Sequence, residues 1–252
     1  MRAFIALVWR ELLWYRAYPL QILSLAVSPP LIVAPYVLFA RLFGVDAELQ
    51  FSVAVGLILW LWLSHLVWEV GYGLDNDMEE GTLESILVTP VSVMTLLAAK
   101  SVNSLIGALY ISVAALGWMS ALGVRLPLSW PLFLGVCLLC GAAMSGFTLL
   151  LAGSALLMKR SENLGQTVQT LLGILSGATM STGLLPAGLW VLSRLIPLSF
   201  GIEAARRLLA GQPIADRLTW MVVSGLVYFA LGQALLKRAE RRMRAAGTTG
   251  EF

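Results

Sequence analysis

Apolar residues fill most of the chain in long runs that are separated by short polar stretches. A helix needs about 20 mostly apolar residues to cross the hydrocarbon core of a bilayer. We predict a membrane-spanning helix for each run of about that length: Pro19–Phe43, Phe51–Leu74, Leu96–Leu122, Pro131–Met158, Gln166–Leu184 and Leu218–Leu236. The pattern therefore predicts an all-α membrane protein with about six transmembrane helices, a single membrane domain over residues 1–252, and short loops.

Residues 1–18 have a different pattern, which predicts a helix lying in the membrane interface. Phe4, Val8, Leu12 and Tyr15 recur at helical spacing, whereas the basic residues fall on another side of the helix. Trp9 and other aromatic residues suit the level of the lipid headgroups. We therefore expect an N-terminal amphipathic helix that precedes the first crossing.

The most polar internal stretch, residues 75–92, separates the second and third apolar runs. Its core, Glu79–Pro90, reads EEGTLESILVTP. Thr82 is suited to cap a helix, Glu84 falls in the first turn, where a negative charge favours the helix dipole, and Pro90 disfavours continuation. Leu83, Ile86 and Leu87 share one face. Such a helix of about two turns is too short to be stable alone in water, so it packs either on its own membrane domain or in a groove of a cytoplasmic protein.

Composition and charge support a membrane protein and set its orientation. Of 252 residues, 59% are hydrophobic and 12% are charged, against about 25% charged in soluble domains. Basic residues concentrate in cytoplasmic segments of membrane proteins. Eleven of the 17 Lys and Arg residues fall on the side of the N-terminus, including the basic tail 237–252. We expect both termini and Glu79–Pro90 in the cytoplasm. The tail lacks interleaved aromatic residues, which argues against nucleic-acid binding.

A few side chains inside the apolar runs are candidates for function. His65 and Glu69 are one helical turn apart, and ionisable groups in a membrane are functional candidates; structural pairing and handling of substrate or protons both remain open. In the fifth run, Gln166 and Thr170 could line a pathway. Gly173 and Gly177 could pack closely against another helix, within the chain or between two copies.

The two cysteines, Cys137 and Cys140, are predicted to pack as small apolar residues in the fourth run. A zinc site needs further ligands, and the single histidine lies in another run. We predict no metal site. The single histidine also excludes an H-E-x-x-H protease, and no G-x-S-x-G sequence is present.

EEGTLESILVTP, and IPLSFGIEAARRLLAG at Ile196–Gly211, resemble the ABC type-2 (export) permease family, the transmembrane subunits of ATP-binding cassette transporters. The resemblance implies a pathway formed by two permease copies, identical or closely related, above two ATPase subunits. Segment 79–90 would be the coupling helix that docks on the ATPase. The matching positions, together with Ile86, are Glu80, Gly81, Thr82, Leu83, Glu84, Leu87, Thr89 and Pro90. Glu203 and Arg206 match a helix in the outer segment 185–215.

The resemblance also implies which chemistry belongs to the partner. This chain has no G-x-x-x-x-G-K-[ST] phosphate loop, so ATP and magnesium are expected in the ATPase, and the chain itself is expected to be a transport subunit without a cofactor. The expected location is the inner membrane of a prokaryote. The expected substrate is amphipathic or hydrophobic: a drug, lipid, glycan or haem-like molecule. The alternative is a proton-coupled secondary carrier that uses His65 and Glu69.

Overall fold

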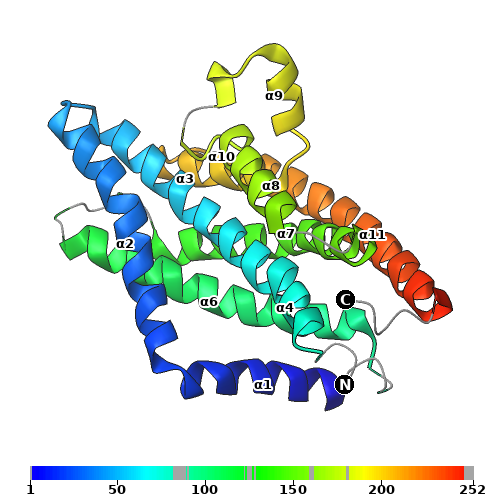
Figure 1. The fold of residues 1–252 in the computed structure, drawn as a ribbon. Helices are drawn as coiled ribbons and strands as arrows, with labels where there is room; N and C mark the ends of the chain where they lie inside the picture. Colours follow the sequence, from blue (N-terminus) through cyan, green and yellow to red (C-terminus); the bar gives the residue numbers. More distant parts are fainter. Residues whose placement is uncertain are drawn as a thin grey trace.

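Long helices run side by side through most of the computed structural model, and shorter helices flank them (Figure 1). The structure describes residues 2–81, 89, 91–121, 123, 127, 129–158, 162–179 and 182–246, and these residues form helices and connecting turns without a strand. The long helices are α2 (Pro19–Leu42), α3 (Ala47–Leu66), α6 (Val93–Ala121), α7 (Trp130–Met158) and α11 (Ala215–Ala246).

The shorter elements begin with α1 (Arg2–Ala17), which meets α2 at a sharp angle and packs along α6 (Figure 1). A π-helical stretch, η1 (Val67–Tyr72), continues α3 and leads into α4 (Gly73–Glu79). The remaining short elements lie between α7 and α11: α8 (Glu162–Leu175), the 3-10 turn η2 (Thr182–Leu184), α9 (Ala187–Ser193) and α10 (Pro197–Leu209). The all-α membrane fold expected from the sequence is confirmed.

Five helical stretches of the described chain are long and apolar enough to cross a membrane: Ile22–Ala40, Ala47–Gly71, Val93–Ala121, Trp130–Ser154 and Ala215–Arg242. They coincide with five of the six predicted runs. Among the described helices, α9 and α10, which meet at 91°, would add a sixth crossing if they count as one broken span.

The prediction of one spanning helix over Gln166–Leu184 is wrong. Helix α8 ends at Leu175 after 14 residues, which at about 1.5 Å per residue covers about 21 Å of a hydrocarbon core of about 30 Å. The chain turns at Gly177, whose φ of +82° is a conformation that glycine adopts without steric cost. Apolar residues continue beyond the turn, so the hydropathy pattern does not reveal it.

Helix α3 forms the centre of the bundle. Within the apolar stretches, 72% of the α3 residues are buried, against 17% in α2 and 17% in α11. Two hydrogen bonds between side chains link α3 to its neighbours: Trp62 Nε1 donates to Ser112 Oγ of α6 at 2.5 Å, and Gln169 Nε2 of α8 donates to Ser64 Oγ at 2.6 Å. The apolar side chains that α2 and α11 expose suit a lipid environment.

Glycines bring α7 and α11 into backbone contact. A Cβ added at Gly146 of α7 would lie 2.6 Å from the backbone nitrogen of Phe229, and a Cβ added at Gly225 of α11 would lie 2.7 Å from Cα of Ala143. Gly232 repeats the contact two turns further along α11, 2.9 Å from the carbonyl oxygen of Gly146. Small residues allow this close approach between membrane helices, where van der Waals packing drives association.

Candidate functional site

Helix α4 leads from the bundle into the predicted docking segment. Glu80 N donates to Asn76 O at 2.9 Å, and the helix ends before Gly81, whose φ of +68° suits a helix C-terminus. Glu80, Gly81 and Thr89 are exposed. The other predicted docking residues lie outside the described residues: Thr82, Leu83, Glu84, Ile86, Leu87 and Pro90.

Lys100 of α6 holds α4 against the bundle. Its side chain is 9% exposed, and Nζ lies 3.0 Å from Oδ2 of Asp77 and donates to the carbonyl oxygen of Gly73 at 3.2 Å. These two contacts attach both the start and the end of α4 to α6. The sequence pattern placed Lys100 near the start of a predicted helix but did not indicate its partners. Gly73 and Asp77 precede it by 27 and 23 residues, and they reach it only because the chain folds back between α4 and α6.

A polar cluster lies where α1, α3 and α6 meet. Asn103 Nδ2 donates to the hydroxyl of Tyr15 at 3.4 Å. A Cβ added at Gly107 would lie 3.0 Å from that hydroxyl and would collide with Nε2 of His65. The glycine therefore lets one tyrosine and one imidazole approach α6 together. Burial first, and then the nearby charge of Glu69, raise the pKa of Tyr15, so its phenol remains protonated.

His65 and Glu69 are not joined by an ion pair in the described part of the chain, although the sequence spacing allows one. The Nε2 atom of His65 is buried and has no hydrogen-bond partner among the described residues. The π-helix that begins at Val67 accounts for the difference, since its turn is wider than an α-helical turn and residues four apart no longer align as they do in an α-helix. His65 instead faces Gly107 and Tyr15.

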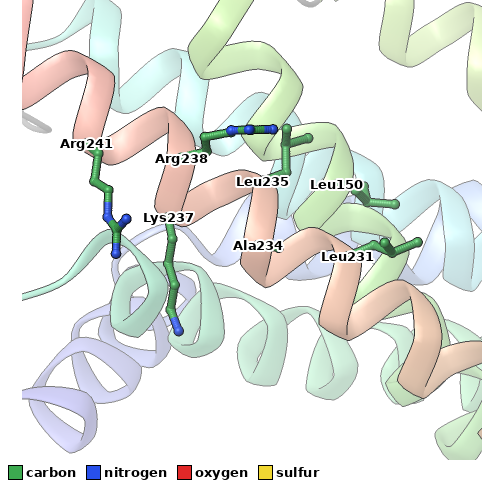
Figure 2. Close-up of a pocket in the computed structure, with 7 residues that line it drawn as sticks. All are labelled: Leu150, Leu231, Ala234, Leu235, Lys237, Arg238 and Arg241. Atoms are coloured by element: carbon green, nitrogen blue, oxygen red, sulfur yellow. The ribbon is translucent and has the colours of Figure 1, made fainter.

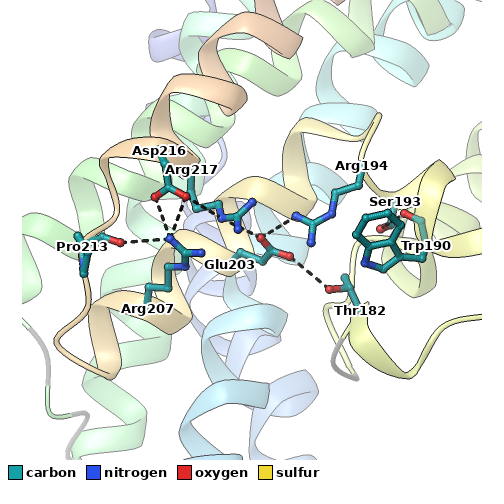
Figure 3. Close-up of polar contacts among 9 residues, drawn as sticks. All are labelled: Thr182, Trp190, Ser193, Arg194, Glu203, Arg207, Pro213, Asp216 and Arg217. Carbon is teal, nitrogen blue, oxygen red and sulfur yellow. Dashed lines mark hydrogen bonds and ion pairs between the residues drawn. The ribbon is translucent and has the colours of Figure 1, made fainter. Parts of the chain in front are cut away.

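The predicted outer residue Glu203 joins elements that surround α10 (Figure 3). Its carboxylate accepts from Nη1 of Arg194 at 2.9 Å and from Oγ1 of Thr182 at 3.3 Å, and it lies 3.2 Å from Nε of Arg217. These partners come from the end of α9, from η2 and from α11. One carboxylate therefore neutralises two guanidinium groups and fixes the position of α10. The Arg194 guanidinium also lies over the ring of Trp190, 4.9 Å from its centre.

Arg206, the second predicted outer residue, binds backbone carbonyl groups. Its Nη2 donates to Gly177 O at 2.7 Å and its Nε donates to Ser52 O at 3.3 Å. Arg206 thereby connects α10 to the turn after α8 and to α3. That turn touches α3 closely, because a Cβ added at Gly56 would collide with the carbonyl oxygen of Ala178. Gly177 serves this turn rather than a helix face.

We expect Glu203→Gln to lower stability by about 2 kcal/mol, a value between those of exposed and buried ion pairs, because its partners are only partly exposed. The amide cannot neutralise Arg194 and Arg217. The melting temperature of the purified protein in detergent should fall by about 4–8 °C. The matched control is Asp216→Asn, since Asp216 is 52% exposed in its pairs with Arg207 and Arg217; that change should leave the melting temperature almost unchanged. Equal losses in both variants would contradict the prediction.

The candidate functional residues of α8 differ in their surroundings. Gln166 and Thr170 are exposed, and Thr170 Oγ1 donates to the backbone oxygen of Gln166 at 2.9 Å. Gly173 packs within the chain, since an added Cβ would lie 2.5 Å from Nε1 of Trp60. The buried polar residue of α8 is Gln169, which lies one residue from Thr170 but on the face toward α3. The sequence signal for it was available: Gln169 shares a face with Leu172 and Gly173.

Cys137 and Cys140 are free and buried. A Cβ added at Gly201 of α10 would lie 2.5 Å from Sγ of Cys140, so this thiol fills space between α7 and α10. No group of three or more His, Cys, Asp or Glu side chains in the described part of the chain is arranged to hold a metal ion.

Comparison with known proteins identifies one family. Residues 2–210 match the family model described as ABC-2 type transporter, which covers the chain from α1 to the residue after α10. No curated protein gives a significant match. The matched range includes both sequence segments that carry the resemblance, Glu79–Pro90 and most of Ile196–Gly211.

Proposed function

Because the chain belongs to the ABC-2 type transporter family and is a membrane-spanning permease subunit of an ABC transporter, we propose that it forms the membrane pathway of an ATP-driven exporter. A second permease copy, identical or closely related, completes the pathway as a dimer. The apolar surfaces of α2 and α11 are available for lipid or for that second copy.

The coupling to ATP hydrolysis is proposed to run through residues 79–90. A separate ATPase subunit binds ATP and magnesium and receives the apolar face of Leu83, Ile86 and Leu87. The observation that supports this route is the attachment of α4 by Lys100, which links the chain immediately before the docking segment to the long helix α6. A force applied to residues 79–90 therefore reaches α6 through a buried ion pair as well as through the chain itself.

The proposed orientation rests on the charge pattern, and the proposed location rests on the family. Eleven of the 17 basic residues fall on the side of the N-terminus, most of them near the two termini, which favours the cytoplasm for that side; residues 79–90 share it because two crossings separate them from the N-terminus. We place the protein in the cell membrane of a prokaryote with both termini in the cytoplasm; with five long crossing helices in the described part of the chain, this requires that α8–α10 together carry the chain across the membrane between α7 and α11. Glu203 and Arg206 then lie on the outer side, in the segment that holds α10 against α3 and α11.

The substrate is proposed to be amphipathic or hydrophobic, such as a drug, a lipid, a glycan or a haem-like molecule. The long helices carry few charged side chains, and two of the described charges near the bundle interior are engaged by neighbours: Lys100 by Asp77, and Arg206 by backbone carbonyl groups. Such a lining offers little compensation for a strongly charged substrate.

The test of this function is association with the ATPase. Leu83→Asp or Leu87→Asp places a carboxylate on the apolar docking face, and we expect each change to weaken co-purification of the ATPase at least about 10-fold. Leu49→Asp is the matched control, because Leu49 is 55% exposed and lies near the start of α3, away from α4. This control should retain the ATPase.

Full retention of the ATPase by both docking variants would contradict the coupling route. Transport in vesicles separates the two function classes. The exporter requires ATP and ignores an imposed pH gradient. Transport that follows a pH gradient without ATP, and is lost in His65→Ala and Glu69→Gln, would instead support the proton-coupled carrier.

A further inference from the structure

A groove between α7 and α11 has an apolar floor near the C-terminal end of α11 (Figure 2). Its volume is about 580 Å³, and Leu231, Ala234 and Leu235 of α11 line it together with Leu150 of α7. Leu235 also lies against Gly153, since a Cβ added there would be 3.2 Å from Cγ of Leu235. The glycine contacts between α7 and α11 therefore shape the groove.

The same groove has a basic rim. Lys237, Arg238 and Arg241 complete its lining, and no acidic residue contributes to it. All three are exposed, and the described part of the chain gives none of them a hydrogen-bond or ion-pair partner. In Figure 2, Lys237 and Arg241 extend to the same side of α11. The rim carries three positive charges without compensation from the groove itself.

Along α11 the apolar groove residues precede the basic ones, in the same order as the acyl chain and the headgroup of a lipid. Leu231, Ala234, Leu235, Arg238 and Arg241 recur at steps of three and four, so they lie along one helical face. The apolar residues come first and the basic residues follow within about two turns. Residues Ala215–Arg242 form a stretch long and apolar enough to cross a membrane. In such a crossing the leucines would lie at acyl-chain depth and the cations, near its end, at headgroup depth.

We propose that this groove is a binding site for an anionic phospholipid, with an acyl chain along the leucines and the phosphate at Lys237, Arg238 and Arg241. Basic residues near an anionic headgroup contribute about 1 kcal/mol each. A zwitterionic lipid offers the same acyl chains but no net negative charge, so the site discriminates by the rim. This inference is independent of the ATPase-coupling route and of the transported substrate.

The test titrates the purified full chain in detergent with palmitoyl-oleoyl phosphatidylglycerol or phosphatidylcholine and counts bound lipid by native mass spectrometry. Wild-type protein should prefer phosphatidylglycerol at least about 10-fold. The triple variant Lys237→Gln, Arg238→Gln, Arg241→Gln should lose that preference. The matched control removes three charges that do not line the groove, by Arg10→Gln, Arg16→Gln and Arg242→Gln, and should keep it.

Two further measurements decide between sources of the effect. Ala234→Trp fills the groove and leaves every charge in place, so it should reduce phosphatidylglycerol binding while the melting temperature stays within a few degrees of the wild-type value. Glycerol phosphate, which has the headgroup charge but no acyl chain, should not displace the lipid. Equal losses in the triple variant and its control, unchanged binding in Ala234→Trp, or displacement by glycerol phosphate would each overturn the proposal.

Discussion

Gly146→Leu is expected to destabilise the protein by about 3 kcal/mol, the upper part of the range for overpacking, and to lower its melting temperature in detergent by about 6–12 °C. Even the first carbon of the new side chain would lie 2.6 Å from the nitrogen of Phe229 and 2.9 Å from the oxygen of Gly225. Both are backbone atoms of α11, so no rotation of a side chain relieves the overlap. Helices α7 and α11, which pack against each other along much of their length, must therefore separate.

The control lies on the same helix. Gly135 is exposed, and an added Cβ there meets no atom within 4 Å, so Gly135→Leu introduces the same side chain with the same gain in helix propensity and no overlap. Its melting temperature should equal or exceed that of the wild type. A loss of similar size in both variants would show that helix separation is not the cause.

The long helices could be predicted because each contains an apolar run long enough to cross a membrane. Five apolar runs became helices, since a chain in a hydrocarbon core must satisfy its backbone hydrogen bonds internally. Their starts lie within about four residues of the expected positions, but α3 ends at Leu66 instead of Leu74 and α11 continues to Ala246 instead of Leu236. The prediction for the run that starts at Gln166 was wrong because burial against α3, rather than hydropathy, decides where α8 ends. The positive φ of Gly177 and the hydrogen bond from Arg206 to its carbonyl group both depend on contacts between residues distant in sequence.

The candidate site was predictable only in part for the same reason. The sequence singled out Glu203 and Arg206, but their partners Arg194, Arg217 and the carbonyl group of Ser52 come from other elements. The glycines of the α7–α11 contact had a readable signal, since Gly146 and Gly153 repeat at seven residues, as do Gly225 and Gly232. The spacing of His65 and Glu69 suggested an ion pair that the structure does not contain among its described residues, because no local sequence pattern predicts the π-helix that begins at Val67.

Lys100→Met is expected to have the largest effect on stability, about 4 kcal/mol, because removal of one partner from a buried ion pair is strongly destabilising and Asp77 loses its ion pair with Lys100. Asp77 is 13% exposed, and the carbonyl group of Gly73 loses its donor as well. The melting temperature should fall by about 8–16 °C. Arg242→Met is the matched control, since Arg242 is exposed, does not line the groove between α7 and α11, and should lose almost nothing.

A double variant separates stability from coupling. In Lys100→Met with Asp77→Leu both charges are absent, and apolar packing can replace a buried pair at little net loss of stability. We expect the double variant to recover to within about 1 kcal/mol of the wild type. A failure to recover would show that the loss of stability in Lys100→Met does not come from its ion pair with Asp77.

The recovered double variant then tests the route proposed for coupling. Its docking face is unchanged, so it should co-purify with the ATPase as well as the wild type does. Spin labels can be placed at two exposed positions, Thr89→Cys in the docking segment and Ala121→Cys at the far end of α6. They report the distance between the docking segment and the far end of α6. A non-hydrolysable ATP analogue should change that distance in the wild-type background and leave it nearly constant in the double variant, because α4 is no longer held to α6. The same change of distance in both backgrounds would mean that the chain connection alone carries the movement, and that the Lys100 contacts only stabilise the fold.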